Sequence, residues 1–237
     1  MTTAPTVLLV DLQYDFFDPR SAVGNPAKGF CLPAVRRIVV HARSRGWPIL
    51  HVITEHEDTT SLPGHLRRRE ATAYAVRDTP GARVVQGLVD EKDRLLRKTK
   101  YSAFSATGCT AALAGVERVI IAGIASDCCI LHTAFDAEAN GKQVFIPLEA
   151  VSGSNETLHV AAMEILEKSV ATIISLSTIL EHEPDHWRAL ADVAQASWAW
   201  YQRSTSLSAA AAASYDDLSA RSGVDVMLDA LERAIAP

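Results

Sequence analysis

The part of this sequence best suited to chemistry is a pair of adjacent cysteines behind an apolar run. Residues 119–124 are apolar, a glycine interrupts them at Gly123, and Cys128 and Cys129 open a helical pattern. This order is typical of a buried strand, a tight turn and a helix start. The helix dipole and unpaired N–H groups there lower the pKa of a thiol, so we expect a nucleophile. A cysteine that only packs in the core is the alternative.

Two further side chains that could carry or hold a proton follow strand-like segments. Asp11 ends the β-rich run of residues 6–12, and Lys98 and Lys100 follow residues 93–97. The carboxyl ends of parallel strands meet at one edge of a sheet, where open α/β folds bind their ligands. We therefore expect Asp11, Lys98 and Cys129 to share that edge. A helix cap at Asp11 and surface positions for the lysines are the alternatives.

The rest of the chain alternates strand-like and helix-like segments that could position these groups. Strands are predicted over residues 6–12, 48–54, 93–97, 119–124, 143–148 and 171–176, and helices over residues 33–46, 107–114, 128–137 and 155–168. Thr107 or Thr110 is expected to cap the second helix, and Ser154 or Asn155 the fourth. The alternation predicts a doubly wound, mainly parallel α/β sheet flanked by helices, a Rossmann-like three-layer fold. Residues 1–180 form this domain, and residues 181–237, with helical patterns only, form a C-terminal helical extension.

Composition excludes several classes of function. The net charge of −5 over 237 residues argues against a nucleic-acid or anionic-membrane partner. The sequence has no apolar run as long as a membrane span and no basic segment ahead of its first apolar run, so we expect a cytoplasmic protein. The four cysteines lack C-x-x-C spacing and do not form the framework of a disulfide-rich protein.

One loop raises the question of a metal. Glu55, His56, Glu57, Asp58 and His65 are ligand types that suit zinc or iron, but their spacing forms no strong motif. We favour a solvated loop. The basic run of residues 67–69 is interpreted as a solvated face or a contact to a substrate carboxylate.

Three separated motifs resemble those of the isochorismatase-like cysteine hydrolases, which include nicotinamidases and N-carbamoyl amide hydrolases. They are V-D-L-Q-x-D-F at residues 10–16, K-x-x-Y-S-A-F at residues 98–104 and G-I-A-S-D-C-C-I at residues 123–130. A D-T-P-G-A turn at residues 78–82 adds weak support. The resemblance covers about residues 5–180 and identifies residues 1–180 as an isochorismatase-like hydrolase domain.

The resemblance implies a role for each matching residue. Asp11 is similar to the family's general base, Lys98 to its catalytic lysine and Cys129 to its nucleophile. The Ile124–Ala125 peptide stands where the family has a cis bond. The backbone N–H groups of Ala125 and Cys129 would then form an oxyanion hole for the developing negative charge.

The same resemblance bears on the pocket and on cofactors. Phe16, Tyr101 and Ile124 are expected to line the substrate pocket. Metal-dependent nicotinamidases carry D-x-H after the second strand, whereas here His56 and Asp58 occupy those places in inverted order. We therefore predict an enzyme without a metal or other cofactor.

These observations predict a cysteine amidohydrolase that cleaves a C–N bond of a small carboxamide, ureido or N-carbamoyl compound through a thioester. In this mechanism the charge of Lys98 lowers the pKa of the Cys129 thiol. An isochorismatase-type ether hydrolase, or a binding protein that kept the fold without catalysis, is the alternative. Isochorismatases have glycine where Cys129 stands, so the cysteine favours C–N hydrolysis. We also expect a homo-oligomer, because such proteins commonly assemble.

Overall fold

The computed structural model describes residues 4–58 and 74–190, which form a three-layer α/β domain. Its sheet has seven strands, all parallel, in the order β3-β2-β1-β4-β5-β7, with the short β6 beside β4. The strands are β1 (Thr6–Val10), β2 (Ile49–Thr54), β3 (Arg94–Lys98), β4 (Arg118–Ile124), β5 (Gln143–Pro147), β6 (Val151–Ser152) and β7 (Ala171–Ile174). The predicted fold class is thereby confirmed.

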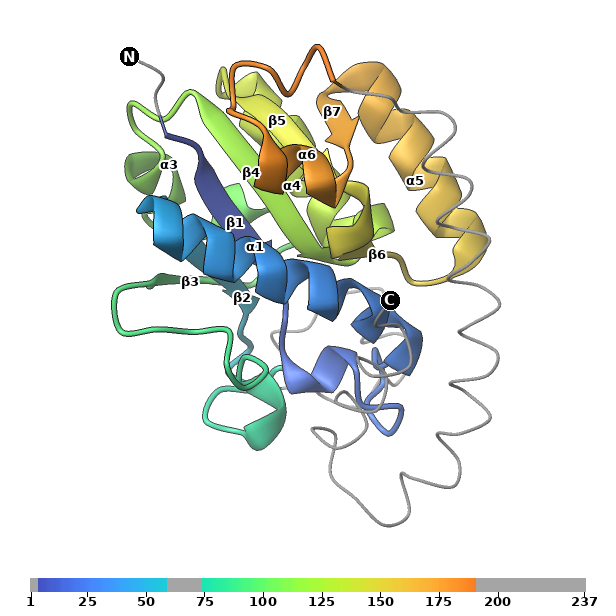
Figure 1. Cartoon of the computed structure of the whole chain (residues 1–237). Coiled ribbons are helices and arrows are strands. Elements are labelled where there is room, and N and C mark those ends of the chain that lie inside the picture. The colour runs from blue at the N-terminus through green and yellow to red at the C-terminus, as the bar shows by residue number, and fades with distance from the viewer. Residues whose placement is uncertain (1–3, 59–73, 191–237) are drawn as a thin grey trace.

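Helices cover both faces of the sheet, which explains why its central strands are apolar throughout (Figure 1). The helices are α1 (Leu32–Arg45), α3 (Cys109–Ala112), α4 (Leu131–Ala139), α5 (Glu156–Ser169) and α6 (Leu176–Glu181). In β1, Val7 and Leu9 pack with α1 and α6, whereas Leu8 and Val10 pack with α3, α4 and α5. Two cores therefore hold the strand ends in place from both sides.

Two helix starts differ from those that the sequence predicts, and a third falls on one of its two expected caps. Gly108, in a left-handed conformation, precedes α3, so neither Thr107 nor Thr110 caps it. Asn155, not Ser154, caps α5 by accepting a hydrogen bond from the N–H of Leu158. The helical chain ahead of α4 begins at Ser126 as a wide turn, η6 (Ser126–Ile130), so helix formation starts two residues before Cys128.

The chain beyond the last strand continues to pack on the domain as far as it is described. Trp187 is fully buried against the rings of Trp47 and Phe145, with centroids 5.7 and 5.2 Å away. This tryptophan therefore belongs to the core of its own subunit. The remaining helical patterns of the predicted extension lie outside the described residues.

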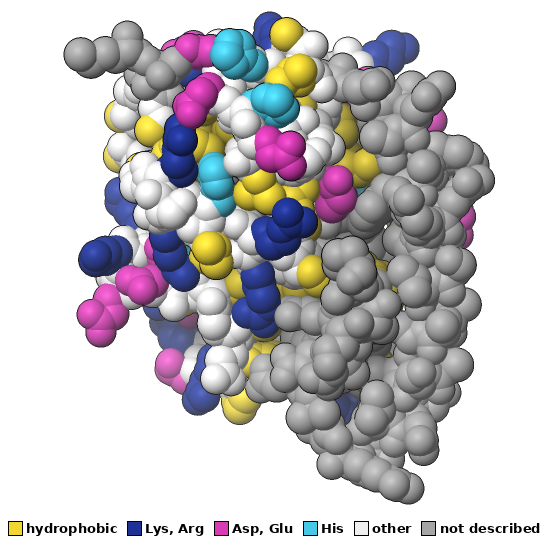
Figure 2. All heavy atoms as spheres, in the orientation of Figure 1, with side chains coloured by type: hydrophobic (Ala, Val, Ile, Leu, Met, Phe, Trp, Pro, Cys, Tyr) yellow, Lys and Arg dark blue, Asp and Glu magenta, His cyan; other side chains and the backbone are white. Residues whose placement is uncertain are grey.

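The surface of the described residues mixes charges of both signs. On the face shown in Figure 2, basic and acidic side chains are interspersed among hydrophobic ones. Within residues 4–58 and 74–190, no helix is long and apolar enough to cross a membrane.

Candidate active site

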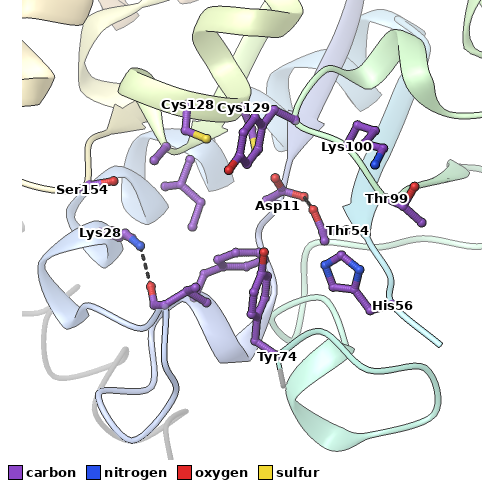
Figure 3. Close-up of a pocket in the computed structure, with 15 residues that line it drawn as sticks. Asp11, Lys28, Thr54, His56, Tyr74, Thr99, Lys100, Cys128, Cys129 and Ser154 are labelled. Carbon is purple, nitrogen blue, oxygen red and sulfur yellow. Dashed lines mark hydrogen bonds between the residues drawn. The ribbon is translucent and has the colours of Figure 1, made fainter. Parts of the chain in front are cut away.

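A cavity of about 210 Å³ lies at the carboxyl edge of the sheet, where β1, β2, β3 and β4 end. The side chains of Asp11, Thr54, His56 and Cys129 line it, as do those of Tyr74 and Lys28 (Figure 3). Asp11 and Cys129 thus meet at the predicted edge, and Lys98 lies directly behind them, buried. The volume suits a small molecule, because ligand pockets are commonly a few hundred cubic ångströms.

The backbone turns sharply at Asp11 to place its carboxylate at this edge. Asp11 has φ +55°, in the left-handed region that aspartate tolerates better than most residues. Its N–H donates to the carbonyl of Val52, so the residue is still tied to β2. On the other side, Gly123 pairs with Val10, and a Cβ at Gly123 would lie 2.1 Å from the Val10 carbonyl oxygen. Only glycine allows β1 and β4 to approach so closely here.

Lys98 is the centre of the polar network. Its Nζ donates to Oδ2 of Asp11 at 2.8 Å, to Oγ1 of Thr54 at 2.8 Å and to Sγ of Cys129 at 3.4 Å. All three N–H donors of the ammonium are therefore used in a dry environment, where such bonds are strong. Burial opposes the charge, but the Asp11 carboxylate and the Cys129 sulfur raise the pKa of Lys98 above its usual value. Lys98 is a permanent cation of this site.

Thr54 is a site residue that the sequence did not reveal. Its hydroxyl donates to Oδ1 of Asp11 at 2.9 Å and accepts from Lys98, so it bridges the carboxylate and the ammonium. Gln13 fixes it in turn, because the amide of Gln13 donates to the carbonyls of Thr54 and Ala82 and accepts the Thr54 N–H, each at 2.8 or 2.9 Å. The pairing of Thr54 with Lys98 across β2 and β3 could only be found from register.

The two cysteines lie in the wide turn that follows β4. The Ile124–Ala125 peptide is cis, as the resemblance implied. The N–H groups of Cys128 and Ile130 donate to the Ala125 carbonyl, which closes the turn and holds Cys129 inside it. Cys129 is buried and contacts Lys98, whereas Cys128 is half-buried and lines the cavity beside it.

The expectation of a lowered pKa at Cys129 is wrong for this geometry. A hydrogen bond to Cys128 and burial raise the pKa of Cys129 well above normal, and they outweigh the opposing charge of Lys98. The same bond lowers the pKa of Cys128, which accepts it. Both causes favour the neutral thiol of Cys129 over its thiolate. The Asp11 carboxylate contacts the same Lys98 ammonium as the Cys129 sulfur, so the two groups lie close together.

The predicted pocket residues all lie on the cavity wall. Phe16, Tyr101 and Ile124 line it, and Tyr74, which the sequence analysis overlooked, stacks edge-to-face on Phe16 with ring centroids 5.7 Å apart. The apolar part of the cavity thus combines aromatic rings with aliphatic side chains. Lys28 is the other overlooked residue, and nothing but its place in an otherwise apolar segment distinguishes it in the sequence.

His56 and Asp58 do not form a metal site with the neighbours that are described. His56 is fully buried, not solvated as expected, and stacks edge-to-face on Tyr74 with centroids 5.1 Å apart. Asp58 is exposed, and no three His, Cys, Asp or Glu side chains gather at a possible metal site within residues 4–58 and 74–190. His65 and the basic run of residues 67–69 lie outside the described residues. The described residues alone therefore give no basis for a step through a metal ion, and we derive none.

Comparison with known proteins places this geometry in context. The model of the Isochorismatase domain matches residues 5–178. A protein of Arabidopsis thaliana described as "Probable inactive nicotinamidase" is 30% identical over 164 residues, which cover 65% of this chain and 84% of that protein.

Two solved structures superpose on the same region. The isochorismatase family protein of Desulfovibrio vulgaris has a TM-score of 0.68 at 26% identity and covers 75% of this chain and 97% of its own. Pyrazinamidase of Pyrococcus horikoshii, in complex with zinc, has a TM-score of 0.65 at 27% identity and covers 73% of this chain and 99% of its own.

Proposed function

The chain belongs to the isochorismatase domain family of hydrolases, and from this premise we propose that it is a metal-independent cysteine amidohydrolase. Its substrates would be small carboxamide, ureido or N-carbamoyl compounds, cleaved at the C–N bond through a thioester. One observation carries the proposal: a single buried ammonium, that of Lys98, contacts both the Asp11 carboxylate and the Cys129 sulfur.

The proposed reaction has two halves. In the first, Asp11 takes the thiol proton of Cys129, and the sulfur attacks the amide carbon. The tetrahedral intermediate expels ammonia or an amine, which takes the proton from Asp11, and a thioester remains. In the second, Asp11 takes a proton from water, the hydroxide attacks the thioester, and the thiol departs with that proton. The net reaction converts an amide and water into an acid and an amine.

Three features of the site support the proposed reaction. The raised pKa of Cys129, due to its hydrogen bond to Cys128 and to burial, favours the thiol over the thiolate, so the proposed reaction needs a base such as Asp11. The positive charge of Lys98 balances the carboxylate and then the developing thiolate. The backbone N–H groups of Ala125 and Cys129 would stabilise the oxyanion, and one such donor is commonly worth about 3 kcal/mol of barrier.

Ammonia release by the purified protein tests the proposal. The assay uses a panel of small carboxamides, ureido acids and N-carbamoyl amines, with and without a chelator. Cys129→Ala should lower the rate of a cleaved substrate by roughly a thousandfold or more, whereas Cys128→Ala should retain turnover. Chelation should leave the rate unchanged.

The failures are informative as well. Loss of activity in Cys128→Ala and not in Cys129→Ala would show that the nucleophile is Cys128 and not Cys129. Vinyl ether cleavage that survives Cys129→Ala would replace the amidohydrolase with an isochorismatase-type hydrolase. Binding of these compounds without turnover of any would leave a protein that kept the fold and the pocket but not the reaction.

A further inference from the structure

A second buried lysine enters the cavity and takes no part in the network described above. The side chain of Lys28 is 7% exposed and points into the pocket from the wall opposite Asp11, near Ser154 (Figure 3). Its Nζ donates to the carbonyl of Val23 at 2.7 Å and lies 6.0 Å from the ring centre of Phe16. Among the described residues, no carboxylate forms an ion pair with it.

The local chain holds Lys28 in place. It lies in a short 3₁₀ helix, η2 (Pro26–Cys31), whose first turn is capped by the Asn25 side chain. The amide nitrogen of Asn25 also donates to the carbonyl of Ser154 at 3.2 Å, which joins this helix to the loop after β6. The bond to Val23 closes the preceding loop over the lysine stem. An ordered cation costs little further entropy when a ligand binds.

The two walls of the cavity differ in charge. On one wall, Asp11 and Lys98 neutralise each other at 2.8 Å. On the other, Lys28 contributes an ammonium that has a neutral carbonyl and an aromatic ring as its contacts. A buried charge without a counter-charge is costly, and a bound anion would remove much of that cost. Cys129 lies between these walls, so a substrate carbonyl at the sulfur could extend a second group toward Lys28.

We propose that Lys28 is a specificity residue that binds a carboxylate of the substrate, so that the preferred amides are acidic ones, such as ureido acids or the half-amides of dicarboxylic acids. This inference rests on the proposed function, because it assumes that the reacting carbonyl lies at Cys129. Ser154, on the same wall, offers a hydroxyl to the same carboxylate.

The electrostatics of the lysine agree with this role. Burial lowers the pKa of Lys28, and the nearby acidic groups, Asp127 first among them, offset this only in part. A substrate carboxylate beside Nζ would raise the pKa of Lys28 again, and the same attraction would strengthen binding of that substrate.

Alkylation with two reagents of nearly equal size tests the proposal without knowledge of the substrate. Iodoacetate carries a carboxylate where iodoacetamide carries a neutral amide, and with each the Cys129 sulfur forms a C–S bond and expels iodide. The rates are measured on Cys128→Ala protein, in which Cys129 is the one thiol on the described part of the cavity wall. The iodoacetate-to-iodoacetamide rate ratio then reports on the attraction of an anion alone.

The key variant is Lys28→Gln, whose amide can still donate to the Val23 carbonyl. It should lower the ratio by about tenfold, the effect of a partly screened attraction between opposite charges, while the iodoacetamide rate stays within about twofold. Lys28→Arg should restore most of the ratio, since it restores the charge. Lys100→Gln removes the same charge from an exposed lysine at the same cavity and should lower the ratio far less.

An unchanged ratio in Lys28→Gln would overturn the proposal. An equal fall of the ratio in Lys100→Gln would also overturn it, because the anion would then respond to the overall positive potential of the cavity and not to a binding site at Lys28. If Lys28→Gln does not fold, the same ratio is measured on Lys28→Met at lowered temperature and on Lys28→Arg. The proposal then requires a fall in the ratio in Lys28→Met and a ratio near that of the parent protein in Lys28→Arg. A failed amidohydrolase is distinguishable from a failed anion site. In the first case no amide is cleaved but the ratio still depends on Lys28, and in the second neutral and acidic amides are cleaved alike.

Discussion

The buried pair of Asp11 and Lys98 should be strongly coupled in the free energy of unfolding. Their side chains are 1% and 0% exposed, and their charged atoms lie 2.8 Å apart. Lys98→Met leaves a buried carboxylate without its cation, and Asp11→Asn leaves a buried ammonium without its anion. Asparagine is the substitution of choice at position 11, because it tolerates the left-handed φ of +55° found there.

The magnitude follows from burial. Removal of one partner of a buried ion pair costs about 3–5 kcal/mol, so two independent losses would sum to about 6–10 kcal/mol. In the double variant neither charge of this buried pair remains, and what is lost is mainly the hydrogen bonds of Lys98 to Thr54 and Asp11. We therefore expect the double variant to lose no more than either single one, with a coupling free energy of about 3 kcal/mol or more.

Urea denaturation of the wild type, both single variants and the double variant at pH 7 measures this cycle. A matched cycle on the exposed pair Arg45 and Glu183, 43% and 55% exposed, should show nearly additive effects. If the losses at Asp11 and Lys98 also add to within about 0.5 kcal/mol, the two groups do not compensate each other, and the charge argument for the site fails.

Three other predictions follow from buried groups. Burial lowers the pKa of His159 to about 4, so its stabilising effect is complete above the unfolded-state value near 6.5 and is lost on acidification. Between pH 7 and pH 5, wild type should lose about 2 kcal/mol more of its unfolding free energy than His159→Gln, and equal slopes in urea titrations would contradict this. Trp187→Ala should cost about 3–5 kcal/mol in the same assay, since the ring is fully buried, whereas a loss below about 1 kcal/mol would mean that residues 182–190 contribute little to the fold. Because the pKa of Lys28 is lowered by burial, the alkylation ratio should fall as pH rises, at a lower pH than for an ordinary lysine. Both reagents need the same Cys129 thiolate, so its own ionisation cancels, and a ratio that is constant up to the ordinary lysine range would refute the prediction.

Local pattern was sufficient for most of the fold. The apolar run at residues 6–12 contains β1, and the run at residues 119–124 makes up all of β4 except Arg118, because strands buried on both faces need continuous hydrophobic sequence. Helix starts were less predictable. The wide turn at Ser126 has no 3.6-residue apolar period, and at Ser154 and Asn155 two good capping residues stand side by side.

The motifs also identified side chains that do meet. Asp11 and Cys129 follow strands and Lys98 ends one, and parallel strands carry all three to one edge, so their proximity was predictable without coordinates. The roles of these three residues as base, cation and nucleophile stay predictions until turnover is measured. The division at residue 180 and the homo-oligomer stay predictions as well.

What the sequence by itself determined is therefore the layer architecture and the three side chains at the ends of its strands, since both depend on periodicity and chain order. Only the tertiary structure decided which neighbours those side chains have. Thr54 lies 44 residues from Lys98, and the Lys28 cation lies far along the chain from the thiol that it would serve. The tertiary structure also reversed the direction expected for the pKa shift of Cys129, because the contact with Cys128 and burial outweigh the charge of Lys98. Energies of this kind depend on distance and desolvation, which no local pattern encodes.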